Sequence, residues 1–124
     1  MGSDRGPAVV GQGAIDAAID APDTLEITLV GNKTIIEELI RSQHNKPENL
    51  RVAHAEAEIQ MTDSPSEAVK KPNTSVAVGI NLLKSGQIDA FVSASNTGAV
   101  MAGSLLTLGR LPGVNRPAIM ALFP

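Results

Sequence analysis

The sequence predicts an α/β fold in which helices flank a mostly parallel sheet. Short apolar strand patterns alternate with helical patterns along the chain, and capping or turn residues separate them. This alternation implies right-handed βαβ crossovers, and such sheets bind ligands beyond the carboxyl ends of their strands. At 124 residues, one core and one domain are expected.

The first half of the chain contains two helix–strand units. Residues 7–20 place small apolar side chains on one helical face, and the proline at its start suits a first helical turn. Residues 25–30 alternate as a strand, residues 34–43 form a helix, and residues 49–55 form a second strand. The second helix is expected to present four side chains to the core: Ile35, Ile36, Leu39 and Ile40.

Capping signals locate two further helices. Ser64 and Glu67 have the spacing of a capping box and predict a short helix that ends at the following proline. Asn73 or Thr74 can cap the next helix, which is expected to stop near residues 85–86.

The last third of the chain is expected to hold a strand at residues 90–93, a helix at 97–108 and a buried strand at 117–123. The helix carries no charge before Arg110, as expected of a helix that is buried on most sides. A parallel sheet needs both faces covered, yet the chain opens with a loop and a helix and closes on a strand. We therefore expect residues 1–124 to be one partial domain that is cut at both ends.

Composition argues against several classes of function. The net charge of −3 and the two aromatic residues provide neither a basic groove nor stacking surfaces, so no nucleic acid is expected as a partner. The absence of cysteine excludes disulfides and thiolate zinc sites, and it agrees with a reducing cytoplasm. Two histidines do not suffice for a dedicated metal site, and neither a metal nor a cofactor is predicted.

The most informative segment is residues 89–99, where an apolar run leads through small polar residues into a helix. The first N–H groups of such a helix carry a partial positive charge, so a phosphate or an oxyanion can bind against them. Ser95, Asn96 and Thr97 can add donors, and Gly98 lets the backbone approach closely. The same pattern also fits a plain N-cap at Ser95 or Asn96.

Five separated segments carry motifs in one order and spacing. They are Met1-Gly2-Ser3-Asp4, Met61-Thr62-Asp63-Ser64-Pro65, Lys70-Lys71-Pro72-Asn73-Thr74-Ser75, Ser93-Ala94-Ser95-Asn96-Thr97-Gly98-Ala99 and Gly109-Arg110-Leu111-Pro112-Gly113-Val114-Asn115-Arg116-Pro117. Together they closely resemble the bacterial PlsX-type phosphate acyltransferases over essentially the whole chain. Ser95 departs from that pattern, which has Gly there, and Ser3-Asp4-Arg5 stands where Gly-Asp-His is more familiar.

The resemblance implies an enzyme of phospholipid synthesis that moves a fatty acyl group from acyl carrier protein to inorganic phosphate and forms acyl phosphate. It also implies a Rossmann-like fold akin to phosphotransacetylase, and a homodimer. The enzyme would be cytoplasmic and would associate with the inner face of the cell membrane through regions outside this chain. Family members carry a strand before Met1 and a long continuation after Pro124, so the chain alone is expected to be inactive.

With this chemistry, Asn96 and Thr97 are the expected catalytic residues, and Ser95 and Gly98 extend the phosphate-binding start of the helix. Phosphate is already a competent nucleophile, so positioning and electrostatic stabilisation should dominate, and one oxyanion donor is worth roughly 3 kcal/mol.

Further candidates lie elsewhere in the chain. Asp4 could orient a lysine, bind a cation or cap a helix, and Ser75 repeats the arrangement of a polar residue at a helix start. Four basic residues could contact phosphate or the acidic carrier protein, although a solvated surface or a helix dipole also accounts for them. They are Lys70, Lys71, Arg110 and Arg116.

Two other functions stay open. One is acyl transfer to phosphate from coenzyme A, as in phosphotransacetylase. The other is a non-catalytic module that holds a phosphorylated ligand. A nicotinamide cofactor is disfavoured, because the Gly-x-Gly-x-x-Gly fingerprint is missing at the 89–99 junction.

Overall fold

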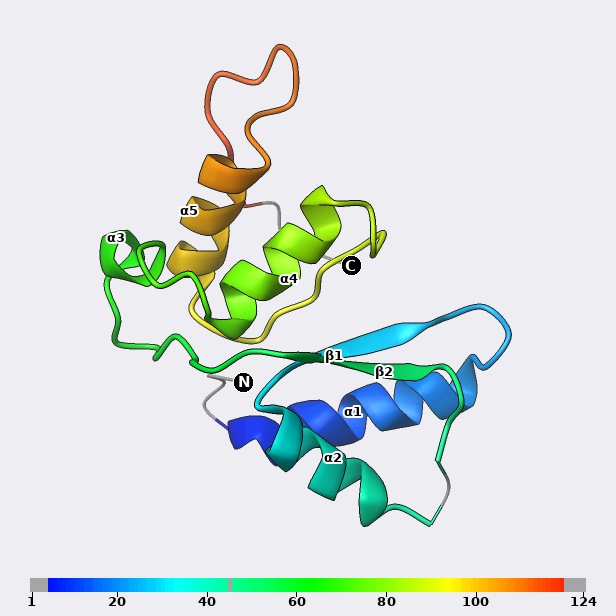
Figure 1. The fold of residues 1–124 in the computed structure, drawn as a ribbon. Helices are drawn as coiled ribbons and strands as arrows, with labels where there is room; N and C mark the ends of the chain where they lie inside the picture. Colours follow the sequence, from blue (N-terminus) through cyan, green and yellow to red (C-terminus); the bar gives the residue numbers. More distant parts are fainter. Residues whose placement is uncertain (1–4, 45, 120–124) are drawn as a thin grey trace.

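The computed structural model describes residues 5–44 and 46–119. Within these ranges the chain forms two strands and five helices (Figure 1). In chain order they are α1 (Gly6–Asp20), β1 (Ile27–Gly31), α2 (Lys33–Arg41), β2 (Leu50–His54), α3 (Pro65–Ala68), α4 (Ser75–Lys84) and α5 (Thr97–Thr107).

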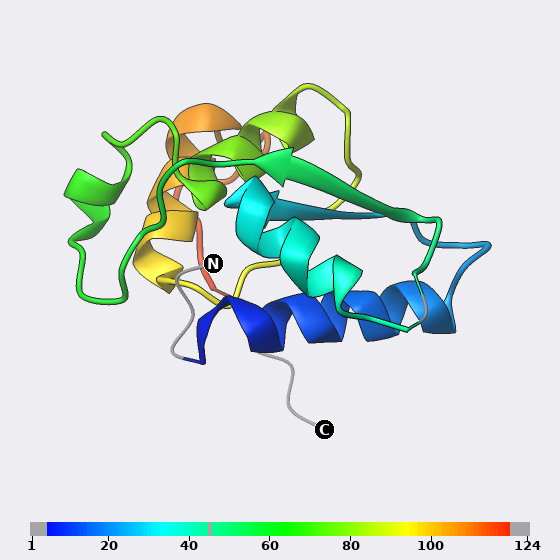
Figure 2. The same cartoon turned by 60° about the horizontal axis from the view of Figure 1, so that its bottom comes forward.

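The two strands pair in parallel and lie between two layers of helices. The register runs from Ile27 opposite Leu50 to Gly31 opposite His54. Helices α1 and α2 lie side by side on one face of the sheet, and α4 covers β1 from the other face (Figures 1 and 2). This arrangement confirms the predicted α/β class with a parallel sheet. A parallel sheet needs helices to cover both of its faces.

Local signals place α2 and α4 as expected, whereas α3 ends at Ala68 and does not continue to the proline at position 72. The side chain of Asn32 caps α2 by accepting hydrogen bonds from the backbone N–H groups of Thr34 and Ile35. Thr74, and not Asn73, caps α4. Within α2, Ile36 is buried but Ile35 is exposed, so the prediction that Ile35 faces the core is wrong. Adjacent helical positions point about 100° apart, which turns Ile35 toward solvent.

A cluster of buried apolar residues joins α4 and α5. Ile59, Val76, Ile80 and Ala99 are buried together, and Phe91 packs against them. Gly79 of α4 lies directly against the ring of Phe91, where an added Cβ would overlap the ring. The segment after α4 is therefore held to the helical layer by one aromatic side chain.

The predicted strand at residues 90–93 is wrong. This segment has no strand conformation, and Val92 is 92% exposed. A strand exists only when a neighbouring strand supplies hydrogen-bond partners, and none pairs with this segment among residues 5–44 and 46–119.

The burial of α5 and the strand predicted at residues 117–123 also differ from expectation. Helix α5 forms as predicted, but it is not buried on most sides, because Ala99 is buried while Leu106 is 73% exposed. Residues 117–119 are exposed and lie outside any strand, and the remainder of the strand expected at 117–123 falls outside the described residues. In the described residues, no helix is long and apolar enough to cross a membrane.

Candidate functional site

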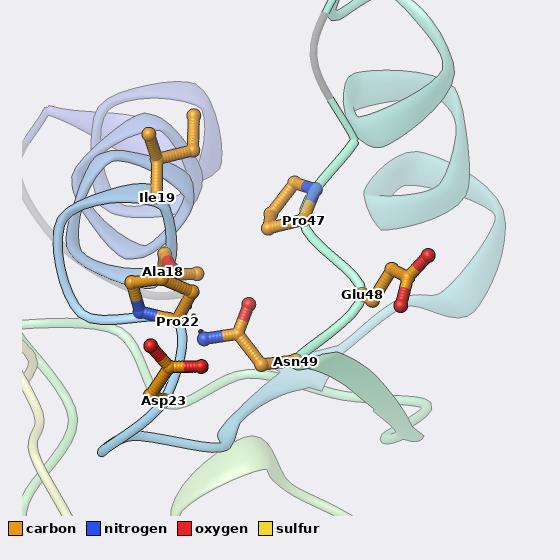
Figure 3. Close-up of a pocket in the computed structure, with 7 residues that line it drawn as sticks. All are labelled: Ala18, Ile19, Pro22, Asp23, Pro47, Glu48 and Asn49. Atoms are coloured by element: carbon orange, nitrogen blue, oxygen red, sulfur yellow. Dashed lines mark hydrogen bonds between the residues drawn. The ribbon is translucent and has the colours of Figure 1, made fainter.

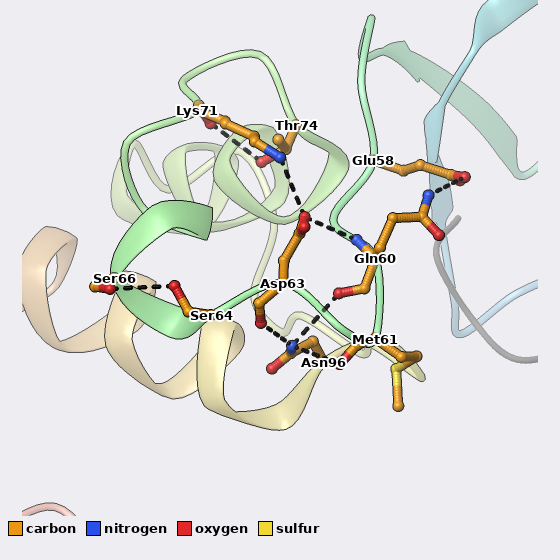
Figure 4. Close-up of polar contacts among 9 residues, drawn as sticks. All are labelled: Glu58, Gln60, Met61, Asp63, Ser64, Ser66, Lys71, Thr74 and Asn96. Atoms are coloured by element: carbon orange, nitrogen blue, oxygen red, sulfur yellow. Dashed lines mark hydrogen bonds and ion pairs between the residues drawn. The ribbon is translucent and has the colours of Figure 1, made fainter.

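The start of α5 is built around the side chain of Asn96. Its Oδ1 accepts a hydrogen bond from the N–H of Ala99 at 3.0 Å and so caps the helix. Its Nδ2 donates to the carbonyl oxygens of Gln60, Met61 and Asp63 at 3.4, 3.1 and 2.9 Å (Figure 4). Asn96 is only 9% exposed. Its amide is thus engaged within the protein, and what remains open at this helix start is backbone and the exposed side chain of Thr97.

The first backbone amide of α5 differs from those of the other two capped helices. In α2 the N–H of Lys33 donates to His54 Nδ1 at 3.3 Å, and in α4 the N–H of Ser75 donates to the Ala57 carbonyl at 3.0 Å. Within the part of the chain that the structure describes, the N–H groups of Thr97 and Gly98 have no such partner. These two amides are the donors that an anion could use.

Gly98 has a packing role at this place. An added Cβ would lie 2.8 Å from Cγ of Pro65, the first residue of α3. The missing side chain therefore lets α3 approach the first turn of α5, a different use from the close approach to a ligand that the sequence suggested.

A charged pair lies next to this helix start. Lys71 Nζ is 3.1 Å from Asp63 Oδ2, and the backbone N–H of Gln60 donates to the same oxygen at 3.1 Å (Figure 4). The Gln60 N–H and, second, the Lys71 ammonium hold the pKa of Asp63 below its ordinary value. The Lys71 side chain is 50% exposed, so its ammonium can reach both Asp63 and solvent.

The start of α4 adjoins the charged pair. Thr74 is buried, and its Oγ1 accepts from the N–H of Ala77 and donates to the carbonyl of Lys71, each at 3.3 Å. Ser75 is 6% exposed, and among residues 5–44 and 46–119 its hydroxyl has no hydrogen-bond partner. Ser95 is buried with its Oγ 2.8 Å from Ser93 Oγ.

Comparison with known proteins decides the family. Residues 1–124 match the family model described as fatty acid synthesis protein. The chain belongs to this family.

Three curated relatives in this family carry the name phosphate acyltransferase. The chain is 45% identical to the protein of Chlorobaculum parvum, 46% to that of Chlorobaculum tepidum and 46% to that of Myxococcus xanthus, each over 125 aligned residues. Each alignment covers the whole chain but only 37%, 38% and 35% of the respective relative. The chain thus spans little more than a third of the length of these relatives, and the sequence resemblance is confirmed.

This member of the fatty acid synthesis protein family gathers some of the predicted site residues and separates others. Five lie on or beside the first turns of α4 and α5: Lys71, Ser75, Asn96, Thr97 and Gly98. Lys70 is exposed in the loop between α3 and α4. Ser95 directly precedes the cap. Arg110 and Arg116 follow the other end of α5, about 16 Å away along an 11-residue helix. There Arg110 Nη1 donates to the Asn115 carbonyl at 2.8 Å, and Asp4 lies outside the described residues.

Asp63 is the residue that sequence reasoning missed. It lies within one of the motifs that carry the family resemblance, but no local periodicity indicates a contact with residue 96, because the two residues are 33 positions apart.

A shallow hollow of about 370 Å³ lies between the loops that precede β1 and β2 (Figure 3). It lies at the amino ends of β1 and β2, where Asn49 Nδ2 donates to the carbonyls of Ala18 and Leu25 at 3.0 and 2.7 Å. The candidate site instead follows the carboxyl end of β2, the side where parallel sheets bind ligands. The residues that line the hollow are Ala18, Ile19, Pro22, Asp23, Pro47, Glu48 and Asn49.

Proposed function

We propose that the full-length protein containing this chain transfers a fatty acyl group to inorganic phosphate and produces an acyl phosphate. The observation that carries this proposal is the identity of 45–46% with proteins named phosphate acyltransferase over the whole chain. Because the chain spans about 37% of such a relative, the activity is assigned to the full-length protein.

The phosphate site is proposed at the start of α5. The N–H groups of Thr97 and Gly98 have no partner among the described residues, and they carry the positive end of the helix dipole. Lys71 supplies a nearby positive charge, and the Ser75 hydroxyl supplies a donor without a partner among the described residues. Ser95 and Asn96 support this loop through contacts within the protein.

The reaction needs little acid–base catalysis. An oxygen of hydrogen phosphate attacks the carbonyl carbon of a thioester, the new C–O bond forms, and the C–S bond breaks. The leaving sulfur takes up the proton that hydrogen phosphate loses, so atoms and charge balance. Donors fixed by the fold can hold the dianion or stabilise the oxyanion that develops on the thioester, which typically contributes about 3 kcal/mol for each donor.

The partners follow from the same proposal. We expect an acylated acyl carrier protein as donor and a second copy of the protein in a homodimer. We expect a cytoplasmic enzyme that associates with the inner face of the cell membrane through regions outside this chain. Lys70, Arg110 and Arg116 are exposed basic residues suited to the carboxylates of an acidic carrier protein. Asp4 stays a proposed member of the phosphate site.

The activity is tested with the full-length protein, acyl carrier protein or coenzyme A thioesters, and inorganic phosphate, with hydroxylamine to trap acyl phosphate. We expect product from the carrier-protein thioester at a kcat/KM at least tenfold above that from the coenzyme A thioester. If neither thioester gives acyl phosphate, the proposed function is wrong.

The position of the phosphate is tested with Thr97→Pro and its control Thr97→Ala. Proline at the first helical position removes the N–H without disturbing the helix, and Asn96 has ψ of 108°, which proline tolerates in a preceding residue. We expect Thr97→Pro to raise the KM for phosphate at least tenfold above that of Thr97→Ala. Equal values for the two variants would place the phosphate elsewhere.

A further inference from the structure

Asp63 joins the charged pair to the start of α5 through two different groups. Its carboxylate holds Lys71 Nζ at 3.1 Å, and its backbone carbonyl accepts from Asn96 Nδ2 at 2.9 Å. The N–H of Gln60 holds the carboxylate from the other side at 3.1 Å. The carboxylate is therefore fixed relative to the first turn of α5, and the ammonium of Lys71 is fixed by the carboxylate (Figure 4).

Lys71 depends on this contact for its orientation. A lysine side chain has four rotatable carbon–carbon bonds, and half of this one is exposed. Asp63 is the carboxylate that pairs with it in the described part of the chain. Lys84, in the last turn of α4, is also exposed and has no ion pair among the same residues, so it provides a matched control away from the candidate site.

We propose that Asp63 is a positioning residue for phosphate, one that holds the Lys71 ammonium beside the start of α5. This inference rests on the function proposed above. An ammonium group has three N–H donors, so Lys71 can keep its bond to Asp63 and still donate to a phosphate oxygen. Asp63 itself does not touch the substrate and acts through Lys71.

The carboxylate could instead oppose phosphate binding, because both are anions. The two effects predict opposite signs when the charge of Asp63 is removed. Loss of positioning raises the KM for phosphate, whereas loss of repulsion lowers it. An ammonium that donates to both anions lies between them and offsets their repulsion, so we expect the positioning effect to prevail.

The test is a double-mutant cycle in the full-length protein, with Asp63→Asn, Lys71→Met and both together. Asparagine can still accept from the Gln60 N–H and keeps the backbone carbonyl, so the fold is expected to persist, and thermal melting checks this. We expect Asp63→Asn to raise the KM for phosphate about fivefold, with kcat within twofold. In the Lys71→Met background the same change should alter KM less than 1.5-fold. Lys84→Met, at the far end of α4, should leave the KM for phosphate unchanged.

Each other outcome overturns the inference. A lower KM in Asp63→Asn would mean that the carboxylate competes with phosphate, and an equal rise with Met at position 71 would mean that Asp63 does not act through Lys71. If Asp63→Asn does not fold, Asp63→Glu takes its place in the cycle with a threshold of a twofold rise. A wild-type protein without acyl phosphate production refutes the proposed function, whereas an active wild type with unchanged Asp63→Asn refutes this inference alone.

Discussion

The Asn96 side-chain nitrogen lies 2.9 Å from the carbonyl oxygen of Asp63, while the oxygen of the same amide caps α5. A carboxylate at position 96 could cap the helix but has no N–H to donate. We therefore expect Asn96→Asp to lower the free energy of unfolding by about 2 kcal/mol, because three loop carbonyls lose a donor and face a negative charge. Urea denaturation measures this loss.

Asn32 provides the matched control for that substitution. It also caps a helix, but the structure gives its side chain only accepting contacts, from the N–H groups of Thr34 and Ile35. A carboxylate serves this purpose equally well at the positive end of a helix dipole, so Asn32→Asp should change stability by less than about 0.5 kcal/mol. Similar losses at both positions would mean that the donated bonds of Asn96 contribute nothing.

Two glycines in helices should respond to alanine in opposite ways. At Gly79 a Cβ would overlap the Phe91 ring, so Gly79→Ala should destabilise the protein by about 1–3 kcal/mol. At Gly13, exposed in α1, the added carbon would meet no atom within 4 Å from the described residues beyond its own stretch of helix, and Gly13→Ala should stabilise by about 0.5–1 kcal/mol. Thermal unfolding of the two variants checks the difference in sign. A stabilised Gly79→Ala variant would show that Phe91 does not pack there.

Signals that act within one or two turns of chain were sufficient to predict the helices. Thr74 and Asn96 cap α4 and α5 because a short polar side chain reaches an amide three residues ahead. The strand pattern at β1 and the apolar spacing in α2 act over equally short distances. The α/β class follows from the order of these elements alone.

Contacts between distant parts of the chain could not be predicted in this way. The apolar residues around Val92 match a strand, but strand formation depends on a partner strand that a sequence pattern does not reveal. Asn96 was identified as a cap or as an anion contact, and only its three contacts with residues 60–63 show that its side chain is fully used. Asp63 went unnoticed for the same reason.

The two apolar residues Ile80 and Val92 should differ sharply in their contribution to stability. Ile80 is buried between α4 and α5, so Ile80→Ala should cost about 2–5 kcal/mol by leaving a cavity. Val92 is almost fully exposed, and Val92→Ala in this chain should cost less than about 0.5 kcal/mol. Chemical denaturation distinguishes the two. A large loss in Val92→Ala would mean that residues 90–93 are buried in solution.

The Asp63 carboxylate predicts a specific dependence of stability on pH. Its folded-state pKa lies below the ordinary value of 3.8, because the Gln60 N–H and then the Lys71 ammonium favour the charged form. A group with a lowered folded-state pKa stabilises the protein above its unfolded pKa, and this contribution disappears as the pH falls through the folded-state pKa. The stability difference between the wild type and Asp63→Asn should therefore stay constant from pH 7 to about 5 and shrink below that. Urea denaturation of both proteins, from pH 7 down to about pH 3, measures this stability difference. A difference that persists unchanged at the acidic end would mean that the Asp63 charge contributes nothing to stability.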